Sequence, residues 1–224
     1  HYLGSPIEAA PRSQFHENNF LYWDAAMEWN GVGDFAPWKD FTGSALQPGQ
    51  GYAYYYYQTM LEFAGTLNQG PLSVTLHKST TGTEAGQGWN LIANPYPSAL
   101  DWDAVAAHTS FPNPSTELES AIYYFDDSPQ DGSQSNYTYY VPSGGTGGTY
   151  GVGTSGASAA IPPMQAFFVK AVSDNVTLTL DDNFRSHTAQ AFYKSKQKQI
   201  IRLHISGNDT QDEAVIRFIP EATA

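Results

Sequence analysis

Three short blocks of the sequence recur in the same order later in the chain, and this repetition constrains the fold more than any other feature. The aligned blocks are residues 1–6 (HYLGSP) with 90–95 (NLIANP), 20–24 (FLYWD) with 122–126 (IYYFD), and 48–52 (PGQGY) with 163–167 (PMQAF). The offset rises from 89 to 102 and then to 115 residues, so the second copy carries two insertions. We therefore predict a tandem repeat of one structural unit.

Short segments rich in aromatic and β-branched residues are bounded by Gly, Pro, Asn or Asp, which is typical of β-strands. They lie at residues 51–57, 72–76, 121–125, 166–170 and 176–180. One helix is predicted at residues 99–107, with Ser98 and Asp101 in capping-box spacing. Near the C-terminus, residues 200–206 and 213–219 predict a hairpin with a six-residue loop.

These patterns predict an all-β protein with one short helix. We expect two sandwich-like units of the jelly-roll or immunoglobulin type, a first unit at residues 1–85 and a second unit at residues 86–192. Residues 193–224 are expected to form the C-terminal hairpin, with the start of a further domain as the alternative for this segment.

The acidity of the chain is confined to its first three quarters. The net charge is −12, and residues 1–168 carry three cations and 15 acids, whereas residues 169–224 carry seven of each. Such a chain repels phosphate backbones, so we expect no nucleic-acid partner. The absence of Cys excludes disulfides and thiolate metal sites. Apolar runs are shorter than the ~20 residues that span a bilayer, so no membrane insertion is expected.

Motifs of common enzymes lack the context that they require. The G-x-G-x-x-G pattern at residues 151–156 lies in a tract rich in Gly, Ser and Thr, whereas a dinucleotide site needs a strand before it and a helix after it. The six histidines have no metal-binding spacing, and no G-x-S-x-G nucleophile elbow occurs. We predict no catalytic residues and expect the protein not to be an enzyme.

Aromatic side chains are the main candidates for ligand contacts, because flat rings stack on the apolar faces of sugars and form protein-binding hot spots. The predicted ligand-binding residues are Trp29, Trp38, Trp102, Tyr55 and Tyr57. For Trp102 the alternative is that it pins the short helix to the sheet. In the run of tyrosines at residues 54–57, alternate side chains face opposite sides of a strand, so one pair should face solvent or a neighbouring segment.

Closely spaced carboxylates on loops are the ligands that Ca²⁺ prefers. Asp126, Asp127 and Asp131 lie in such a segment and are the predicted metal ligands, with smaller groups at residues 101–103 and 181–183. A structural calcium ion is thus the candidate cofactor, and plain turn formation is the alternative.

Three segments carry a family resemblance: residues 88–103 (GWNLIANPYPSALDWD), 161–171 (IPPMQAFFVKA) and 207–218 (GNDTQDEAVIRF). They resemble a repeat module of large secreted or surface proteins of Bacteroidota, commonly exported by the type IX secretion system and ending in a C-terminal sorting domain. The resemblance implies a secreted or cell-surface β-rich module that is adhesive, carbohydrate-binding or enzymatic, and it implies no catalytic residues.

The leading functional hypothesis is a non-catalytic extracellular module that binds carbohydrate or mediates surface adhesion. Its expected partner is a polysaccharide or a cell-surface glycan or protein, besides other domains of the parent chain. The alternative is a structural spacer in a multidomain secreted protein, and an enzyme of unknown type is the third hypothesis. Exposed Trp29 and Trp38 would favour binding, whereas packed Trp side chains would favour the spacer.

Overall fold

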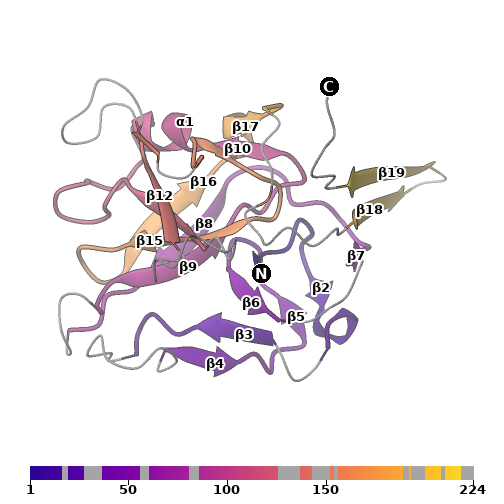
Figure 1. Ribbon diagram of the computed structural model, residues 1–224, viewed down its shortest axis with the longest axis horizontal. Helices are drawn as coiled ribbons and strands as arrows, with labels where there is room; N and C mark the ends of the chain where they lie inside the picture. The colour runs from indigo at the N-terminus through magenta and orange to yellow at the C-terminus, as the bar shows by residue number, and fades with distance from the viewer. Residues whose placement is uncertain are drawn as a thin grey trace.

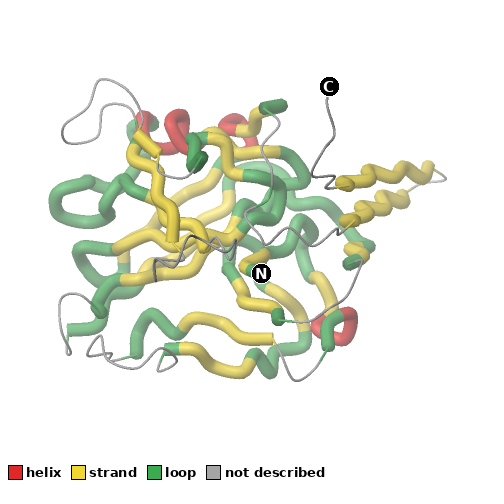
Figure 2. The backbone as a smooth tube through the Cα atoms, viewed as in Figure 1, coloured by secondary structure: helices red, strands yellow, loops and turns green. Residues whose placement is uncertain are grey.

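The computed structural model describes residues 1–16, 20–27, 37–55, 61–80, 86–125, 137–142, 152–153, 156–188, 192, 200–207 and 210–217. The regular structure of these residues is almost entirely β, apart from the six-residue helix α1 (Trp102–Ala107) and two 3-10 turns, η1 (Arg12–Gln14) and η3 (Asp182–Phe184) (Figure 2). The predicted all-β fold is confirmed.

The first sheet contains four strands of the first unit and lies at the bottom of Figure 1. Its order is β1 (Tyr2–Leu3), β6 (Tyr52–Tyr54), β3 (Phe20–Trp23) and β4 (Trp38–Asp40), all antiparallel. A smaller pair, β2 (Ala10–Pro11) with β5 (Ala45–Leu46), packs beside it. Alternation along β6 buries Tyr52 and Tyr54 on one face of the sheet, against Phe20.

The second sheet contains five strands of the second unit. Its order is β13 (Val152–Gly153), β12 (Tyr137–Val141), β11 (Ile122–Phe125), β15 (Ala166–Lys170) and β9 (Trp89–Ala93), so β9 lies at its edge. The helix α1 and the small sheet β14 (Ala160–Ile161), β10 (Ala99–Asp101) and β17 (Arg185–Ser186) lie above it in Figure 1.

Two further strand pairs join distant parts of the chain. Strand β8 (Leu72–Leu76), at the end of the first unit, pairs with β16 (Val176–Leu180) of the second unit over its whole length. The hairpin of β18 (Ile200–Gly207) and β19 (Thr210–Arg217) attaches to β7 (Glu62–Phe63) through parallel pairing by β18. The units are therefore joined by pairing as well as by the chain.

The strand registers of the two units have the same offsets as the sequence blocks. In the first sheet Leu3 pairs with Tyr52, and in the second sheet Ile92 pairs with Phe167. Leu3 and Ile92 lie 89 residues apart in the sequence, and Tyr52 and Phe167 lie 115 residues apart, which are the offsets of the aligned blocks. The next pairs along the strands, Tyr2 with Ala53 and Leu91 with Phe168, follow the same rule.

The contacts between the units are reciprocal. The N–H of Gly4 donates to the carbonyl of Met164 at 2.8 Å, and the N–H of Ala93 donates to the carbonyl of Gly49 at 2.9 Å. The two donors, Gly4 and Ala93, are 89 residues apart, and the two acceptors, Met164 and Gly49, are 115 residues apart. Each unit therefore donates the equivalent hydrogen bond to the other. Gly4 is glycine because a Cβ at this position would overlap the Cβ of Ala93.

Three clusters of apolar side chains hold these layers together. One lies inside the second unit and includes Trp102, Tyr124 and Phe167, and another lies inside the first unit and includes Phe20 and Tyr52. The third, the inter-sheet layer, lies between the two sheets. Its members are buried Leu91, Ala93, Ala166 and Phe168 with half-buried Tyr2, Trp23, Trp38, Trp89 and Tyr123.

Two local predictions need correction. Helix α1 begins at Trp102 rather than at residue 99, because Leu100 is held extended by pairing with Ile161 on one side and Arg185 on the other. Its cap is Asp101, whereas the Ser98 hydroxyl accepts a hydrogen bond from Arg185 Nε at 2.7 Å. The C-terminal hairpin is present, but its strands extend to Gly207 and Thr210, so the predicted six-residue loop is too long.

Candidate functional site

A cleft of about 510 Å³ opens between the two units. Strand β3 and the turn after it form one side, the turn before β6 forms the floor, and β8 and the edge strand β9 form the other side. Its lining residues are Tyr22, Trp23, Asp24, Ala25, Ala26, Gln47, Pro48, Gly49, Gln50, Ser73, Val74, Thr75, His77, Asn90, Leu91 and Ile92. The cleft thus combines aromatic, amide, hydroxyl, imidazole and carboxylate groups.

Trp23 is the larger aromatic residue of the lining, and its position is fixed by the inter-sheet layer. Its ring packs edge to face on Trp38 and on Phe168, with centroid distances of 5.1 and 5.0 Å. Its Nε1–H donates to the backbone carbonyl of Trp89 at 2.7 Å. A half-buried indole held in this way offers a rigid apolar surface at the boundary between the units.

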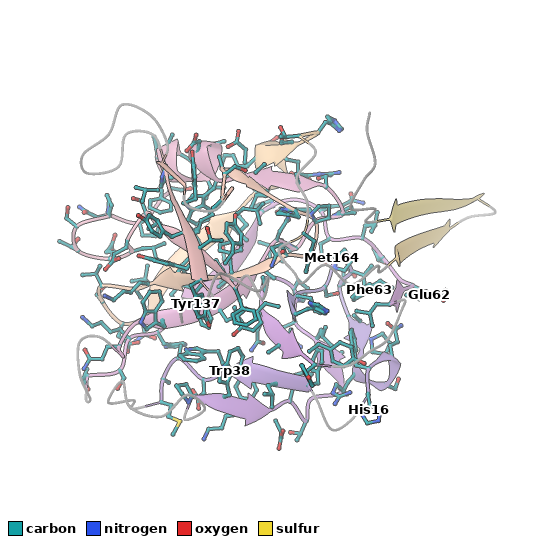
Figure 3. All side chains as sticks on the ribbon, in the orientation of Figure 1. His16, Trp38, Glu62, Phe63, Tyr137 and Met164 are labelled. Atoms are coloured by element: carbon teal, nitrogen blue, oxygen red, sulfur yellow. The ribbon has the colours of Figure 1, made fainter. Side chains whose placement is uncertain are left out.

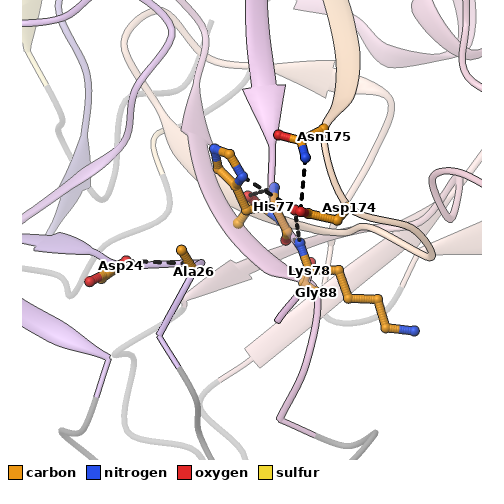
Figure 4. A network of polar contacts seen from close by, with 8 residues as sticks. Asp24, Ala26, His77, Lys78, Gly88, Asp174 and Asn175 are labelled. Atoms are coloured by element: carbon orange, nitrogen blue, oxygen red, sulfur yellow. Dashed lines mark hydrogen bonds and ion pairs between the residues drawn. The ribbon is translucent and has the colours of Figure 1, made fainter. Parts of the chain in front are cut away.

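Asp24 follows Trp23 at the end of β3 and is held by a tight turn. Its backbone N–H donates to the carbonyl of Pro37 at 2.9 Å, and its Oδ1 accepts the N–H of Ala26 at 3.2 Å (Figure 4). Among the described residues its Oδ2 has no hydrogen-bond partner. The carboxylate therefore keeps one oxygen available at the cleft.

The opposite side of the cleft is organised by Asn90, a nearly buried residue of β9. Its Oδ1 accepts the backbone N–H of His77 at 2.9 Å, and its Nδ2 donates to the carbonyls of His77 and Gly88 at 2.9 and 2.8 Å. The side-chain amide of Asn90 is thus fully used to fix the backbone that follows β8. This places the imidazole of His77 across the cleft from Asp24 (Figure 4).

His77 has an acidic partner at the rim. Its Nδ1 lies 3.3 Å from Oδ1 of Asp174, and both side chains are partly exposed. The backbone N–H of Lys78 donates to the same oxygen at 3.1 Å and, with His77, lowers the pKa of the Asp174 carboxyl below its ordinary value. Within the described part of the chain, Nε2 of His77 has no hydrogen-bond partner and is available to a ligand.

The floor of the cleft holds two amide side chains. Gln50 Oε1 accepts the Tyr52 hydroxyl at 3.1 Å, and that hydroxyl in turn accepts the backbone N–H of Gln47 at 2.9 Å. Burial raises the pKa of Tyr52 to about 12, so this hydroxyl is protonated and orients Gln50. The Gln50 amide N–H groups are left as neutral donors, and the exposed Thr75 adds a hydroxyl from β8.

The predicted ligand-binding residues lie elsewhere or outside the described residues. Trp38 is half-buried in the inter-sheet layer, where it packs on Tyr2 at 5.4 Å and faces the same layer as Tyr137 (Figure 3). Tyr55 is 71% exposed, in agreement with the expected alternation, whereas Tyr54 is buried. Trp29 and Tyr57 lie outside the described residues.

For Trp102 the prediction of a ligand contact is wrong. Its side chain is completely buried, its Nε1–H donates to the carbonyl of Ser120 at 2.7 Å, and its ring packs edge to face on Phe167 at 5.6 Å. A ring enclosed in this way has no face left for a ligand. Trp102 instead pins α1 to the second sheet, which was the alternative considered for it.

The predicted metal ligands Asp126, Asp127 and Asp131 lie outside the described residues. Within the described part no group of three or more His, Asp or Glu side chains is arranged to hold a metal ion. The two smaller acidic groups serve turns. Asp101 caps α1 by accepting the N–H groups of Asp103 and Ala104, and Asp181 accepts the N–H of Asn183 at the start of η3.

Sequence reasoning missed most of the cleft residues. Asp24 carried a usable signal, because it closes one of the recurring blocks directly after a strand. Gln50 carried a similar signal, because it is identical to Gln165 in the block 48–52, but its position in the cleft depends on the contact of this turn with β9. His77 carried none, because it reaches the cleft only through the pairing of β8 with β16.

Comparison with known proteins places the chain in one family. A family model described as a domain of unknown function, DUF8693, matches residues 1–224, so the chain belongs to this family. No curated protein and no solved structure matches the chain significantly. Among the described helices, none is long and apolar enough to cross a membrane.

Proposed function

We propose that the protein is a non-catalytic extracellular module that binds carbohydrate in the cleft between its two units. One observation carries this proposal: the cleft places the aromatic residues Tyr22 and Trp23 beside polar groups that the fold leaves unused, namely Asp24 Oδ2, the Gln50 amide N–H groups and His77 Nε2. Its volume of about 510 Å³ lies within the ~300–1,000 Å³ of typical small-ligand sites.

The chemistry of a sugar fits this arrangement. A pyranose ring has apolar C–H faces that pack on aromatic side chains and hydroxyls that both donate and accept hydrogen bonds. Asp24 would accept from hydroxyls, Gln50 would donate to them, and Thr75 can do either. The pairing of β8 with β16 and the hydrogen bonds of Asn90 support a preformed site, which lowers the entropy lost on binding.

We propose that the module arose by duplication, because the sequence blocks, the strand registers and the reciprocal hydrogen bonds share one set of offsets. A secreted or cell-surface location is proposed from the resemblance of residues 88–103, 161–171 and 207–218 to repeat modules of such proteins. Binding of a polysaccharide or a cell-surface glycan would then serve adhesion or substrate targeting by the parent protein.

A structural spacer is the second candidate, and the packing of the Trp side chains favours it. Trp23, Trp38 and Trp89 are half-buried in the inter-sheet layer, and Trp102 is buried. A layer of interlocked rings would keep the two units from bending relative to each other, as a spacer requires.

Affinity electrophoresis through gels that contain single polysaccharides tests the binding proposal. Thr75→Trp would fill the cleft from β8, whereas Thr177→Trp is a matched control, because Thr177 is the exposed cross-strand partner of Thr75 on β16 and does not line the cleft. We expect at least one polysaccharide to retard the wild type and the control, and not the cleft variant. Absence of retardation in every gel would contradict the proposal and leave the spacer.

A further inference from the structure

Resting on the proposed carbohydrate binding, we infer that the cleft selects neutral sugars and rejects sugars that carry carboxylate or sulfate groups, with Asp24 as the specificity-determining residue. The shape of the cleft does not determine the charge of its ligand. That charge is determined by the charged groups around the cleft and by the hydrogen bonds that hold them.

Asp24 is fixed at the cleft by its own backbone. Its N–H donates to Pro37, its carbonyl accepts the N–H of Met27 at 3.2 Å, and its Oδ1 accepts the N–H of Ala26. A carboxylate held by such a turn cannot swing away from a ligand without breaking the turn. Its free Oδ2 can accept hydrogen bonds from the hydroxyls of a neutral sugar.

The other lining residues that the structure describes supply no fixed cation to balance an anionic ligand. None of the described lining residues is Lys or Arg, and their side-chain donors include the neutral amide of Gln50 and the neutral hydroxyl of Thr75. Lys78, which follows His77, donates from its Nζ to the carbonyl of Val172 at 3.1 Å, and Lys39 is the cross-strand partner of Tyr22; neither side chain lines the cleft.

His77 does not reverse this balance. Its Nδ1 is engaged with Asp174, so any positive charge on the imidazole is offset by the carboxylate beside it. Among the described lining residues, Asp24 thus carries a negative charge that no neighbouring cation offsets, within a chain of net charge −12. An anionic sugar would meet like charge both at long range and at contact.

Binding measurements on matched polysaccharides test the selectivity. Wild type, Asp24→Asn and a control, Asp40→Asn, are compared at pH 8 on a neutral panel (glucan, mannan, xylan) and a polyuronate panel (alginate, polygalacturonate). Asn keeps the Oδ1 that caps the turn, and Asp40 is an exposed residue of β4 outside the cleft.

We expect the wild type and Asp40→Asn to bind a neutral polysaccharide at least 10-fold more tightly than any polyuronate. Asp24→Asn should lose about 10-fold in affinity for the neutral ligand. It should also reduce the ratio of neutral to polyuronate affinity, because the negative charge that repels the polyuronate is gone. Equal wild-type binding of both panels, or unchanged selectivity in Asp24→Asn, would overturn the inference while the proposed function stands. Binding of neither panel by the wild type would overturn both.

Discussion

Gly49 and Met164 occupy corresponding positions in the two units, and both have left-handed backbone conformations, with φ of +80° and +61°. Each supplies the carbonyl that accepts a hydrogen bond from the other unit. A left-handed conformation is unfavourable for Met by about 1–2 kcal/mol, yet Met164 adopts it, because the turn must aim this carbonyl across the boundary. The reciprocal hydrogen bonds therefore determine the backbone of both turns.

Substitution of Gly49 tests the packing beneath this turn. Gly49→Ala should lower the free energy of unfolding by about 2–4 kcal/mol, since Ala is strained at positive φ and its Cβ would lie 2.6 Å from Leu72 Cδ2 and from Val74 Cγ1. Gly70→Ala is the control, with a φ of +68° and no atom within 4 Å of the added Cβ, and should lose only about 1 kcal/mol. Urea denaturation measures the free energy of unfolding of both variants. Equal losses of stability would show that the contacts of the added Cβ with β8 do not contribute.

Removal of the Trp102 ring should be among the most damaging changes to the second unit. Trp102→Ala should lower the free energy of unfolding by about 3–5 kcal/mol, because it opens a large cavity in a closely packed core. Trp102→Phe keeps most of the ring but leaves the Ser120 carbonyl without its donor, and should lose about 1–3 kcal/mol. Thermal and chemical unfolding measure the order of stability of wild type, Trp102→Phe and Trp102→Ala. A Trp102→Ala protein as stable as wild type would contradict the packing role of Trp102.

Asn90 contributes both to the stability of the fold and to the position of the cleft residue His77. Asn90→Asp is nearly isosteric, but it replaces the Nδ2 donor by an oxygen that faces the carbonyls of His77 and Gly88. We expect a loss of stability of at least about 2 kcal/mol at pH 7 and weaker polysaccharide binding, because His77 loses its backbone support. Asn113→Asp, on an exposed turn, is the comparison, and a similar loss for both variants would argue against the cleft-organising role.

Buried tyrosines should limit stability at high pH. Burial raises the pKa of Tyr52 to about 12, and burial together with the hydrogen bond to Asp103 raises that of Tyr140 to about 12. Because these values exceed the ~10 of an unfolded tyrosine, the stability that they contribute is complete below pH 10 and is lost as the pH rises toward 12. Tm should thus fall between pH 10 and 12, and Tyr140→Phe should show a shallower fall. A Tm that is flat to pH 12 would contradict this.

The strands that the sequence predicted best are those whose pattern is local. Residues 72–76, 166–170 and 176–180 are strands with the predicted bounds, because each is a continuous apolar or alternating run between turn residues. The helix start was misplaced because the pairing of Leu100 with Ile161 and Arg185 overrides local capping signals, and such long-range pairing leaves no trace in the spacing of residues.

The candidate site depended on contacts that the sequence does not encode locally. Two of the aromatic residues predicted to bind ligand, Trp38 and Trp102, instead pack within the fold, because burial of their indole rings stabilises the apolar layers. The cleft residues that replace them, such as Gln50 and His77, are polar residues of ordinary appearance. Their place in the cleft comes from the strand β9, which is left at a sheet edge and faces the first unit.

The pairing of β8 with β16 also bears on how this protein is inherited. A recombination event between the two copies would separate β8 from its partner strand and would break the reciprocal hydrogen bonds of Gly4 and Ala93. Either unit alone would then expose a sheet edge and one side of the inter-sheet layer, and both surfaces promote aggregation. Gene rearrangements that preserve a folded protein should therefore move the two units together.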